Sequence, residues 1–436
     1  MLRALSRPAT RLMERWLPDA FIFVIVLTLV AAIAAMATQG TSPVQLVQLW
    51  GDGFWSLLQF AMQMLLVLVT GFILASSPPV RRALARIAGL ATSRGGAILL
   101  VSVVSLAASW INWGFGLVVG AIFAKEVARQ IRVDYRLLIA TAYSGFVIWH
   151  GGLSGSIPLT IATEGHFTAD QIGVIDTGQT IFSTWNLMIV AAVLIVVPLV
   201  NRLMLPLEHE QVIVDPDKLG NDTQPQPIYN PTPAQRLENS PILMWAIGLP
   251  GLVWLGLYFA QGGGINLNVV NFLFLFLGIL CHGTARSLLG ALDEAVRGGA
   301  GIVIQFPFYA GIMAIMTGSG LAASMSEWFV SISTADTLPF WSFISAGIVN
   351  IFVPSGGGQW AVQAPVMLPA AEAIGADIPR VVMGVAWGDA WTNLLQPFWA
   401  LPMLGIAGLK PRDIMGFCVV QLLFTGVLIG GMLYLL

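Results

Sequence analysis

Long apolar stretches separated by short polar segments run through most of the chain. A helix needs roughly 20 apolar residues to cross a bilayer, and about nine stretches approach or exceed that length. They lie near residues 20–38, 54–75, 137–162, 181–200, 241–260, 268–281, 299–317, 382–408 and 414–436. Two further apolar stretches, 96–124 and 340–372, are too long for one span and too short for two. The pattern predicts an all-α integral membrane protein.

The composition agrees with this and excludes several classes of partner. Of the 436 residues, 57% are hydrophobic and 10% are charged, whereas about a quarter of a soluble domain is charged. The net charge is −2 without a basic domain, so we expect no nucleic-acid partner. Cys281 and Cys418 lie in apolar stretches, which favours core residues over a disulfide or metal site. The main partner is the lipid bilayer.

The lysines and arginines assign a side to each loop. Nineteen of the 20 precede the first span or fall in alternate loops. By the positive-inside rule these segments face the cytoplasm, and only Arg380 lies outside. The N-terminus is then cytoplasmic and the C-terminus is outside. The loops without any cation are 39–53, 163–180, 261–267 and 318–339.

The same count accounts for the two unusual stretches. Segment 96–124 has basic residues at both ends, so it enters and leaves on the cytoplasmic side as a re-entrant hairpin. Segment 340–372 follows a cation-free loop and enters from outside. Non-helical backbone at membrane depth is tolerated only beside protein or a water-filled cavity. Two opposed hairpins therefore predict a central site.

The chain divides into two halves with the same order of elements, namely span, span, hairpin, span and span, in opposite orientations. Each half carries a proline within a late span, Pro158 or Pro397, which lies 42 residues after Gly116 or Ser355 at a hairpin tip. We interpret this as an inverted repeat, the recurrent plan of secondary carriers. The predicted parts are 1–200 with its hairpin, a cytoplasmic linker 201–240, and 241–436 with an extra span at 241–260 and the outer hairpin.

An anionic substrate would be bound without a buried cation, because no lysine or arginine lies inside an apolar segment. Helices interrupted by glycine or proline expose N–H groups at membrane depth, and hydroxyl and amide groups complete an anion site. Such a neutral lining suits a monovalent carboxylate. The candidate substrate ligands are Asn112, Gly114, Gly116, Ser154, Ser156, Ser355, Gly356, Gly357, Gly358, Gln359, Asn393 and Gln396. Aromatic residues available to pack an alkyl chain, unless they are interface anchors, are Trp110, Trp113, Phe115, Trp360, Phe398 and Trp399.

Two ionisable residues lie well inside predicted spans. His150 and Asp389 each precede the central proline of their half by eight residues. Such groups are costly in a membrane and usually functional, which makes both candidates for ion coupling. The alternative is that they face an aqueous vestibule or pair structurally.

Motifs for energy coupling and catalysis are absent. No lysine follows a glycine as a P-loop requires, and HExxH, GxSxG and CxxC do not occur. We therefore expect a secondary or passive transporter, not an enzyme, with no cofactor and no metal site.

The chain contains the segments WGDGFW (50–55), INWGFGLVVG (111–120), QFPFYAGI (305–312), VPSGGGQW (353–360) and QPFWALP (396–402). These five segments resemble the short-chain fatty acid transporter family, and the resemblance covers essentially the whole chain. It implies uptake of acids such as butyrate or acetoacetate across a bacterial cytoplasmic membrane, coupled to H⁺ or Na⁺. It also implies membership of the ion-transporter superfamily, a homodimer, and an elevator mechanism in which a domain with two hairpins moves against a scaffold. The matching tips are Asn112 to Gly116, including Trp113, and Pro354 to Gln359, whereas His150 lies outside the family motifs.

Three other functions stay open on the sequence. A carrier of dicarboxylates or other small organic anions would need a second cationic or strongly polar cluster, which is missing. A channel would share the hairpins, although opposed repeats favour alternating access. An intramembrane enzyme using Asp389 and His150 would have to transform its substrate.

Overall fold

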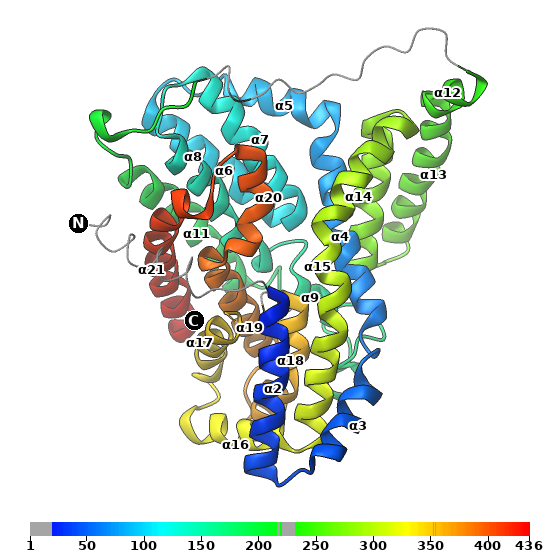
Figure 1. Cartoon of the computed structure of the whole chain (residues 1–436), viewed down its shortest axis with the longest axis vertical. Coiled ribbons are helices and arrows are strands. Elements are labelled where there is room, and N and C mark those ends of the chain that lie inside the picture. Colours follow the sequence, from blue (N-terminus) through cyan, green and yellow to red (C-terminus); the bar gives the residue numbers. More distant parts are fainter. Residues whose placement is uncertain (1–19, 216–218, 220–231, 352, 354) are drawn as a thin grey trace.

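The computed structural model describes residues 20–215, 219, 232–351, 353 and 355–436 (Figure 1). Its elements in this part are all helical, without a strand, which confirms the predicted all-α class. In chain order they are α2 (Ala20–Gln39), α3 (Pro43–Gly53), α4 (Leu58–Ser76), α5 (Pro78–Ala88), α6 (Arg94–Ile111), α7 (Trp113–Gln130), α8 (Tyr135–Ser144), the 3₁₀ helix η1 (Gly145–Gly151), α9 (Ser156–Ile161), α10 (Ala169–Ile172), α11 (Thr184–Leu203), η2 (Glu208–Glu210), α12 (Pro233–Glu238), α13 (Pro241–Ala260), α14 (Leu267–His282), α15 (Ala285–Gly318), α16 (Leu321–Ile332), α17 (Leu338–Val349), α18 (Gly356–Ile374), α19 (Ile378–Thr392), η4 (Asn393–Leu395), α20 (Pro397–Ala407) and α21 (Pro411–Leu435).

Several helices have the length and composition of membrane spans. Helices α13 and α21 match the predicted spans 241–260 and 414–436 within three residues. Helix α15 differs, because its 34 residues extend well before the predicted span 299–317. At 1.5 Å per residue this helix exceeds the roughly 30 Å hydrocarbon core, so one end projects beyond it. In the described part, seven segments are long and apolar enough to cross a membrane, namely Leu58–Ser76, Arg94–Ile111, Tyr135–Ile161, Thr184–Leu203, Pro233–Ala260, Ala285–Gly318 and Pro411–Leu435.

Two predicted spans are interrupted. Span 137–162 consists of α8, η1 and α9, and span 382–408 consists of α19, η4 and α20. Pro158 lies in the first turn of α9, and Pro397 is the first residue of α20. The first turn of a helix tolerates proline because its N–H groups have no partner within the helix. Each proline therefore lies in the first turn of the helix that follows the break.

Helices α6 and α7 form a hairpin that turns at the single residue Asn112. At the other end, Arg94 Nε donates to the carbonyl oxygen of Arg132 at 3.2 Å, so α6 begins near where α7 ends. Figure 1 shows both of these ends at the top of the molecule. A Cβ on Gly116 would lie 2.5 Å from Ser109 Cα, so the glycine lets the two helices meet closely. Because α6 alone is long enough to cross a membrane, re-entry stays a prediction.

Helices α17 and α18 pack antiparallel in the lower part of Figure 1. Residues successively later in α18 contact residues successively earlier in α17. The contacts are Gln359 Nε2 to the carbonyl of Ala346 at 2.8 Å, Gln363 Nε2 to Ser345 Oγ at 2.7 Å and Ser342 Oγ to Met367 Sδ at 3.5 Å. The second predicted hairpin therefore also consists of two adjacent helices.

The helix starts do not follow the predicted equal spacing. The residues that cap α7 and α18 are Asn112 and Ser355, so Gly116 lies one turn inside α7. The 42-residue distances to Pro158 and Pro397 thus start from positions that differ in local structure. The inverted repeat and the division at 1–200, 201–240 and 241–436 stay predictions.

Two glycines in the interrupted spans have more similar surroundings than the two hairpin tips. Gly145 and Gly384 lie 239 residues apart, as do His150 and Asp389. A Cβ on Gly145 would lie 2.6 Å from the α6 backbone, and one on Gly384 would lie 2.3 Å from the backbone of Pro339 in α17. Each interrupted span therefore contacts the first helix of its own hairpin through a glycine.

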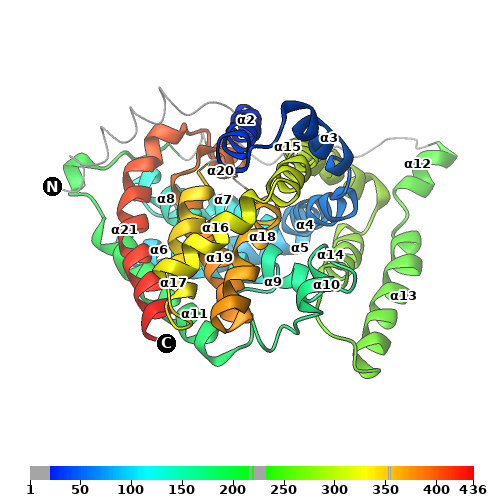
Figure 2. The ribbon, with the colours of Figure 1, turned by 90° about the horizontal axis from the view of Figure 1, so that it is seen from below.

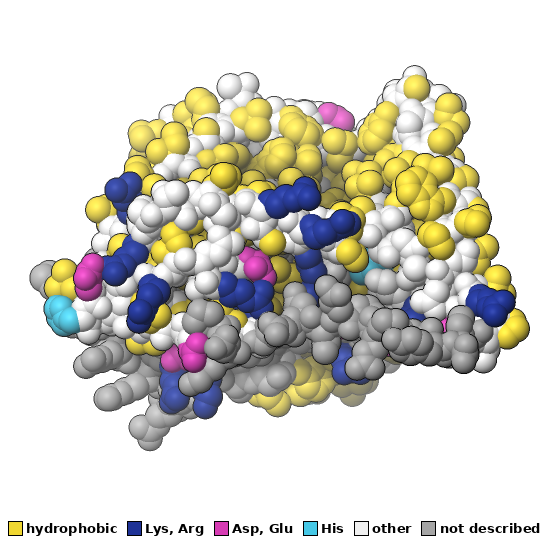
Figure 3. All heavy atoms as spheres, turned by 90° about the horizontal axis from the view of Figure 1, so that it is seen from above, with side chains coloured by type: hydrophobic (Ala, Val, Ile, Leu, Met, Phe, Trp, Pro, Cys, Tyr) yellow, Lys and Arg dark blue, Asp and Glu magenta, His cyan; other side chains and the backbone are white. Residues whose placement is uncertain are grey.

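Two groups of helices face each other. One contains α2, α3, α4, α13, α14 and α15, and the other contains α6 to α9, α11 and α17 to α21 (Figures 1 and 2). Helix α4 contacts α7 and α15 contacts α18 across the boundary. Figure 3 shows lysine and arginine side chains gathered on the end of the molecule that is uppermost in Figure 1.

Candidate functional site

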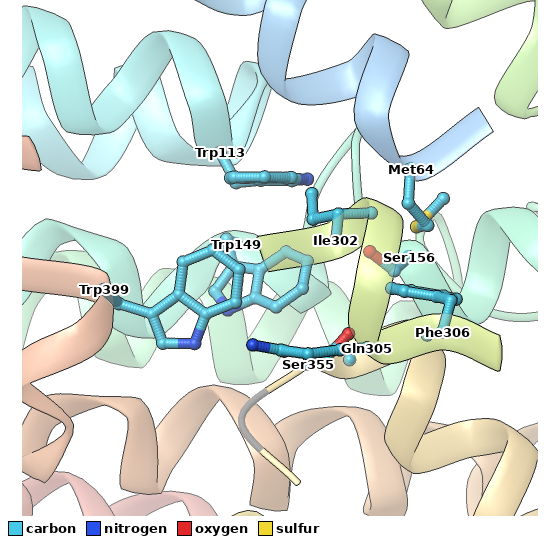
Figure 4. A pocket seen from close by; sticks show the side chains of 11 residues that line it. Met64, Trp113, Trp149, Ser156, Ile302, Gln305, Phe306, Ser355 and Trp399 are labelled. Carbon is cyan, nitrogen blue, oxygen red and sulfur yellow. The ribbon is translucent and has the colours of Figure 1, made fainter. Parts of the chain in front are cut away.

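A small cavity lies between the two groups of helices (Figure 4). Its volume is about 20 Å³, which is room for one water molecule. Helices α4 and α15 form one wall, while η1 and the starts of α7, α9, α18 and α20 form the other. The lining residues are Met64, Ile302, Gln305 and Phe306 on the first wall and Trp113, Trp149, Ser156, Ser355, Gly356, Gly357 and Trp399 on the second. A carboxylic acid fits this cavity only if the walls move apart.

The start of α7 is satisfied in part by its own cap. The side-chain oxygen of Asn112 accepts a hydrogen bond from the N–H of Phe115 at 2.9 Å, and the N–H of Trp113 donates to Ser154 Oγ at 2.8 Å. Asn112 is fully buried, and its Nδ2 has no partner among the described residues. Asn112 Nδ2 is thus an unpaired donor at this helix start, and the N–H of Gly114 also has no acceptor among the described residues, so the cap satisfies only part of the start.

The start of α18 keeps backbone donors beside the cavity. Ser355 Oγ accepts from the N–H of Gly358 at 3.3 Å. The N–H groups of Gly356 and Gly357 have no acceptor among the described residues, and both residues line the cavity. The first N–H groups of a helix carry partial positive charge and bind anions. This helix start can therefore receive a carboxylate without any cationic side chain.

Three successive glycines at this start are in close contact with three other elements. A Cβ at any of these positions would displace a neighbouring side chain, so glycine is needed for the packing. The atoms that it would meet are His150 Nε2 at 2.4 Å for Gly356, Phe60 Cζ at 2.5 Å for Gly357 and Tyr309 Cδ2 at 2.4 Å for Gly358. Enlarging Gly357 would consequently displace Phe60 as well as fill the cavity.

The two predicted ionisable residues meet in the interior. His150 Nε2 and Asp389 Oδ1 lie 3.3 Å apart, and both side chains are 0% exposed. No ring nitrogen or carboxylate oxygen of the pair has a hydrogen bond to the described residues. An ionised pair is costly to desolvate in low dielectric. Gain or loss of one proton would change the net charge of this buried pair. Gly356 lies between His150 and the cavity, so the pair is directly behind the cavity wall.

Two predicted ligands have structural partners instead. The side-chain oxygen of Asn393 accepts from Trp149 Nε1 at 3.0 Å, and Gln396 Nε2 donates to the carbonyl of Asn350. The hydroxyl of Tyr143 donates to the carbonyl of Asn393 at 2.6 Å. These bonds join the break at η4 to η1, to α8 and to the end of α17.

The structure brings five of the predicted ligands to the cavity and distributes the others around it. Trp113, Ser156, Ser355, Gly356 and Gly357 line it. Those with contacts elsewhere are Asn112 and Ser154 at the cap of α7, Gly114 against Leu68, Gly116 against α6, Gly358 against Tyr309, Gln359 bonded to Ala346 and Gln363, and Asn393 and Gln396 at η4. Pro354 lies outside the described residues.

Several lining residues were not predicted as ligands. Gln305 and Phe306 begin the segment QFPFYAGI, which carried the family resemblance but no chemical signal. Met64 and Ile302 lie in continuous apolar helices. Only the packing of α4 and α15 against the hairpins brings these residues to the cavity.

Comparisons with known proteins agree with the fold and the motifs. Residues 1–436 match the family described as short chain fatty acid transporter. A candidate short-chain fatty acid transporter of Escherichia coli (strain K12) is 46% identical over 432 residues, 98% of each chain. A candidate of the same kind from Haemophilus influenzae is 43% identical over 440 residues, again 98% of each. The YdaH transporter of Alcanivorax borkumensis has a similar fold, with a TM-score of 0.60, 17% identity, and 95% of this chain and 98% of that one covered. The resemblance in the sequence is thereby confirmed, and this chain belongs to the short-chain fatty acid transporter family.

Proposed function

We propose that this protein takes up short-chain monocarboxylic acids, such as butyrate or acetoacetate, across a bacterial cytoplasmic membrane by proton-coupled alternating access. Family membership and the two candidate relatives support transport of short-chain fatty acids. The observation that carries the proposal is the position of the buried His150–Asp389 pair behind Gly356 at the cavity.

The lining favours an acid with one charge and a short apolar tail. The carboxylate would be bound by the N–H groups of Gly356 and Gly357. Figure 4 shows Trp113, Trp149 and Trp399 close together at the cavity, where they offer an apolar surface. No cation is among the lining residues, so the second carboxylate of a dicarboxylic acid would remain without a counter-charge.

A proton is the coupling ion that the buried pair suits. The neutral pair holds one proton, and a second one makes it a cation, which compensates the charge of a carboxylate bound nearby. Sodium remains the alternative, and its ligands would be carbonyl and hydroxyl oxygens at the hairpin tips. Among the described residues, no group of three or more His, Cys, Asp and Glu side chains is placed to hold a metal ion.

The arrangement of helices supports movement of one group against the other. The cavity lies on their boundary, so relative movement would open it to one side or the other. The end rich in lysine and arginine would face the cytoplasm, with the N-terminus inside and the C-terminus outside. The re-entrant hairpins, the elevator mechanism and the homodimer are parts of this proposal.

Uptake by purified protein in liposomes tests the proposal. We expect labelled butyrate to accumulate under an imposed pH gradient, acidic outside, and not under a sodium gradient at equal pH. Protein-free liposomes give the passive diffusion of the undissociated acid, which is subtracted. Unlabelled propionate should compete and succinate should not. Accumulation driven by sodium alone would contradict proton coupling, and equal competition by succinate would contradict the substrate class.

A further inference from the structure

A second cavity lies at the N-terminal end of α4, the end away from the lysine- and arginine-rich side. We call it the vestibule; its volume is about 140 Å³, and its walls include Ser56, Gln59, Phe60, Glu164 and Phe167. Ser56, Gln59 and Glu164 are exposed, so the vestibule reaches the surface. In the proposed orientation it opens to the outside.

Phe60 forms the wall between the vestibule and the central cavity. Its side chain is 6% exposed and lines the vestibule. On its other side the ring lies 5.7 Å from the ring of Phe306, measured between centroids, and its Cζ is 2.5 Å from the Cβ position of Gly357. Both of these residues line the central cavity. One aromatic ring therefore separates the two spaces.

The neighbours of Phe60 continue this path. Met64, one turn further along α4, lines the central cavity and also lies beside Gly357. Phe167 contacts Phe60 from the vestibule side, with ring centroids 5.5 Å apart, and does not line the central cavity. Figure 4 shows Met64 and Phe306 on the side of the cavity opposite Trp399. Entry from the vestibule would thus bring the acid past Phe60 to the start of α18.

We propose that Phe60 is the outer gate of the substrate site, closed against Phe306 and Gly357 in this structure. The proposal rests on the proposed function, because it assumes that the central cavity receives the substrate. Rotation of the Phe60 side chain would join the vestibule to the central cavity without unfolding any helix. No backbone hydrogen bond has to break for this movement, because the Phe60 side chain is held by apolar contacts with Phe306 and Gly357.

Thiol labelling tests the gate independently of transport. The reporter is Ser156→Cys in the central cavity, in a background in which Cys281→Ser and Cys418→Ala remove the native thiols. A small membrane-impermeant methanethiosulfonate is added from outside, and the labelling rate is measured. With Phe60→Ala we expect the labelling rate to rise about tenfold or more. The rate is proportional to the fraction of time that the gate is open, and removal of the ring leaves the path permanently open.

Two controls make the result decisive. Phe167→Ala removes a ring of the same size from the vestibule and should leave the labelling rate of Ser156→Cys unchanged. Ser56→Cys, in the vestibule, should react in every background and shows that the reagent reaches the outer face, while size-exclusion chromatography checks that each variant is folded. If Phe60→Ala folds poorly, Phe60→Leu serves in its place, with a smaller increase expected.

Equal labelling rates with and without the Phe60 ring would contradict the proposed gate even if transport is normal. If the reporter variants label as expected but the wild-type protein does not carry butyrate, only the proposed function is contradicted.

Discussion

His150 and Asp389 are separated by 239 residues in the chain, yet their side chains meet, with Nε2 and Oδ1 3.3 Å apart and no solvent exposure. Each belongs to an interrupted span, and each precedes by eight residues the proline in the first turn of the next helix. Their contact joins the two interrupted spans at one point. Both residues were predicted from sequence as candidates for coupling, and the contact between them was one of the alternatives considered.

Replacing Asp389 by asparagine should uncouple transport. Asp389→Asn removes the carboxylate that would share a proton with His150, while the amide keeps nearly the same volume. We expect exchange of internal for external butyrate to continue and accumulation under a pH gradient to be lost. Counterflow and gradient-driven uptake in the same liposomes separate the two activities. Wild-type accumulation by a folded Asp389→Asn protein would show that the pair does not carry the coupling proton.

The pair should also be coupled in stability. His150→Leu leaves the carboxyl group of Asp389 buried without its partner, and loss of one member of a buried pair costs about 3–5 kcal/mol. The double variant His150→Leu/Asp389→Asn should be less destabilised than the sum of the two single changes. Chemical unfolding in detergent, with tryptophan fluorescence as the signal, measures the free energies. Strict additivity would mean that the two side chains do not interact.

Gly116→Ala should separate the helices of the first hairpin. The new methyl group would meet the backbone of Ser109, with Cα at 2.5 Å and N at 2.6 Å, and backbone cannot move aside as a side chain can. Overpacking of this kind costs about 1–3 kcal/mol. Gly431→Ala in α21 is the matched control, because nothing lies within 4 Å of its Cβ position. Thermal unfolding should show a loss for Gly116→Ala only, and equal melting temperatures would contradict the close approach of α6 and α7.

The loop 162–183 should loosen at acidic pH. Burial lowers the pKa of His166 below its usual value, an effect that exceeds the opposite influence of its hydrogen bond to the Gly173 carbonyl. The folded loop therefore favours neutral His166, whose Nδ1 accepts from the N–H of Thr168 at 3.3 Å. The stabilisation of the loop by neutral His166 is therefore fully present above the unfolded pKa of about 6.5. It is lost as the pH falls from there through the folded pKa.

Hydrogen exchange of this loop measures the effect. After correction for the intrinsic rate, exchange should become faster as the pH is lowered from about 7.5 to about 5.5. His166→Gln should remove most of this pH dependence. His209→Gln, at an exposed position in the linker, is the control and should leave it intact. If His166→Gln shows the same pH dependence as the wild type, another group controls the loop.

Helix positions could be predicted from sequence where hydropathy alone determines them. Helix α13 coincides with its predicted span because a continuous apolar run with polar ends has one stable placement in a bilayer. The breaks near Pro158 and Pro397 followed from proline chemistry. The start of α15 was missed, because Arg286 and Arg297 mark the end of the apolar part but do not stop a helix.

The site could be predicted only in part. Ser355 and the following glycines were found because a glycine-rich helix start within an apolar stretch has few other uses. Asn393 was predicted as a ligand, but a buried amide can equally pair with the protein, as it does here with Trp149. Met64 could not be found, since it differs in no local feature from the other apolar residues of α4.

The glycines at the start of α18 also make this tip a mechanical junction. Gly356, Gly357 and Gly358 have no side-chain rotamers to absorb a displacement, and each is in contact with a side chain from a different element. A shift of the tip by a fraction of an ångström must therefore move His150, Phe60 and Tyr309 together. An anion that pulls on this backbone would alter the His150–Asp389 pair and the position of Phe60 at once, although it touches neither. By reciprocity, protonation of the pair would change the affinity for the anion by the same factor.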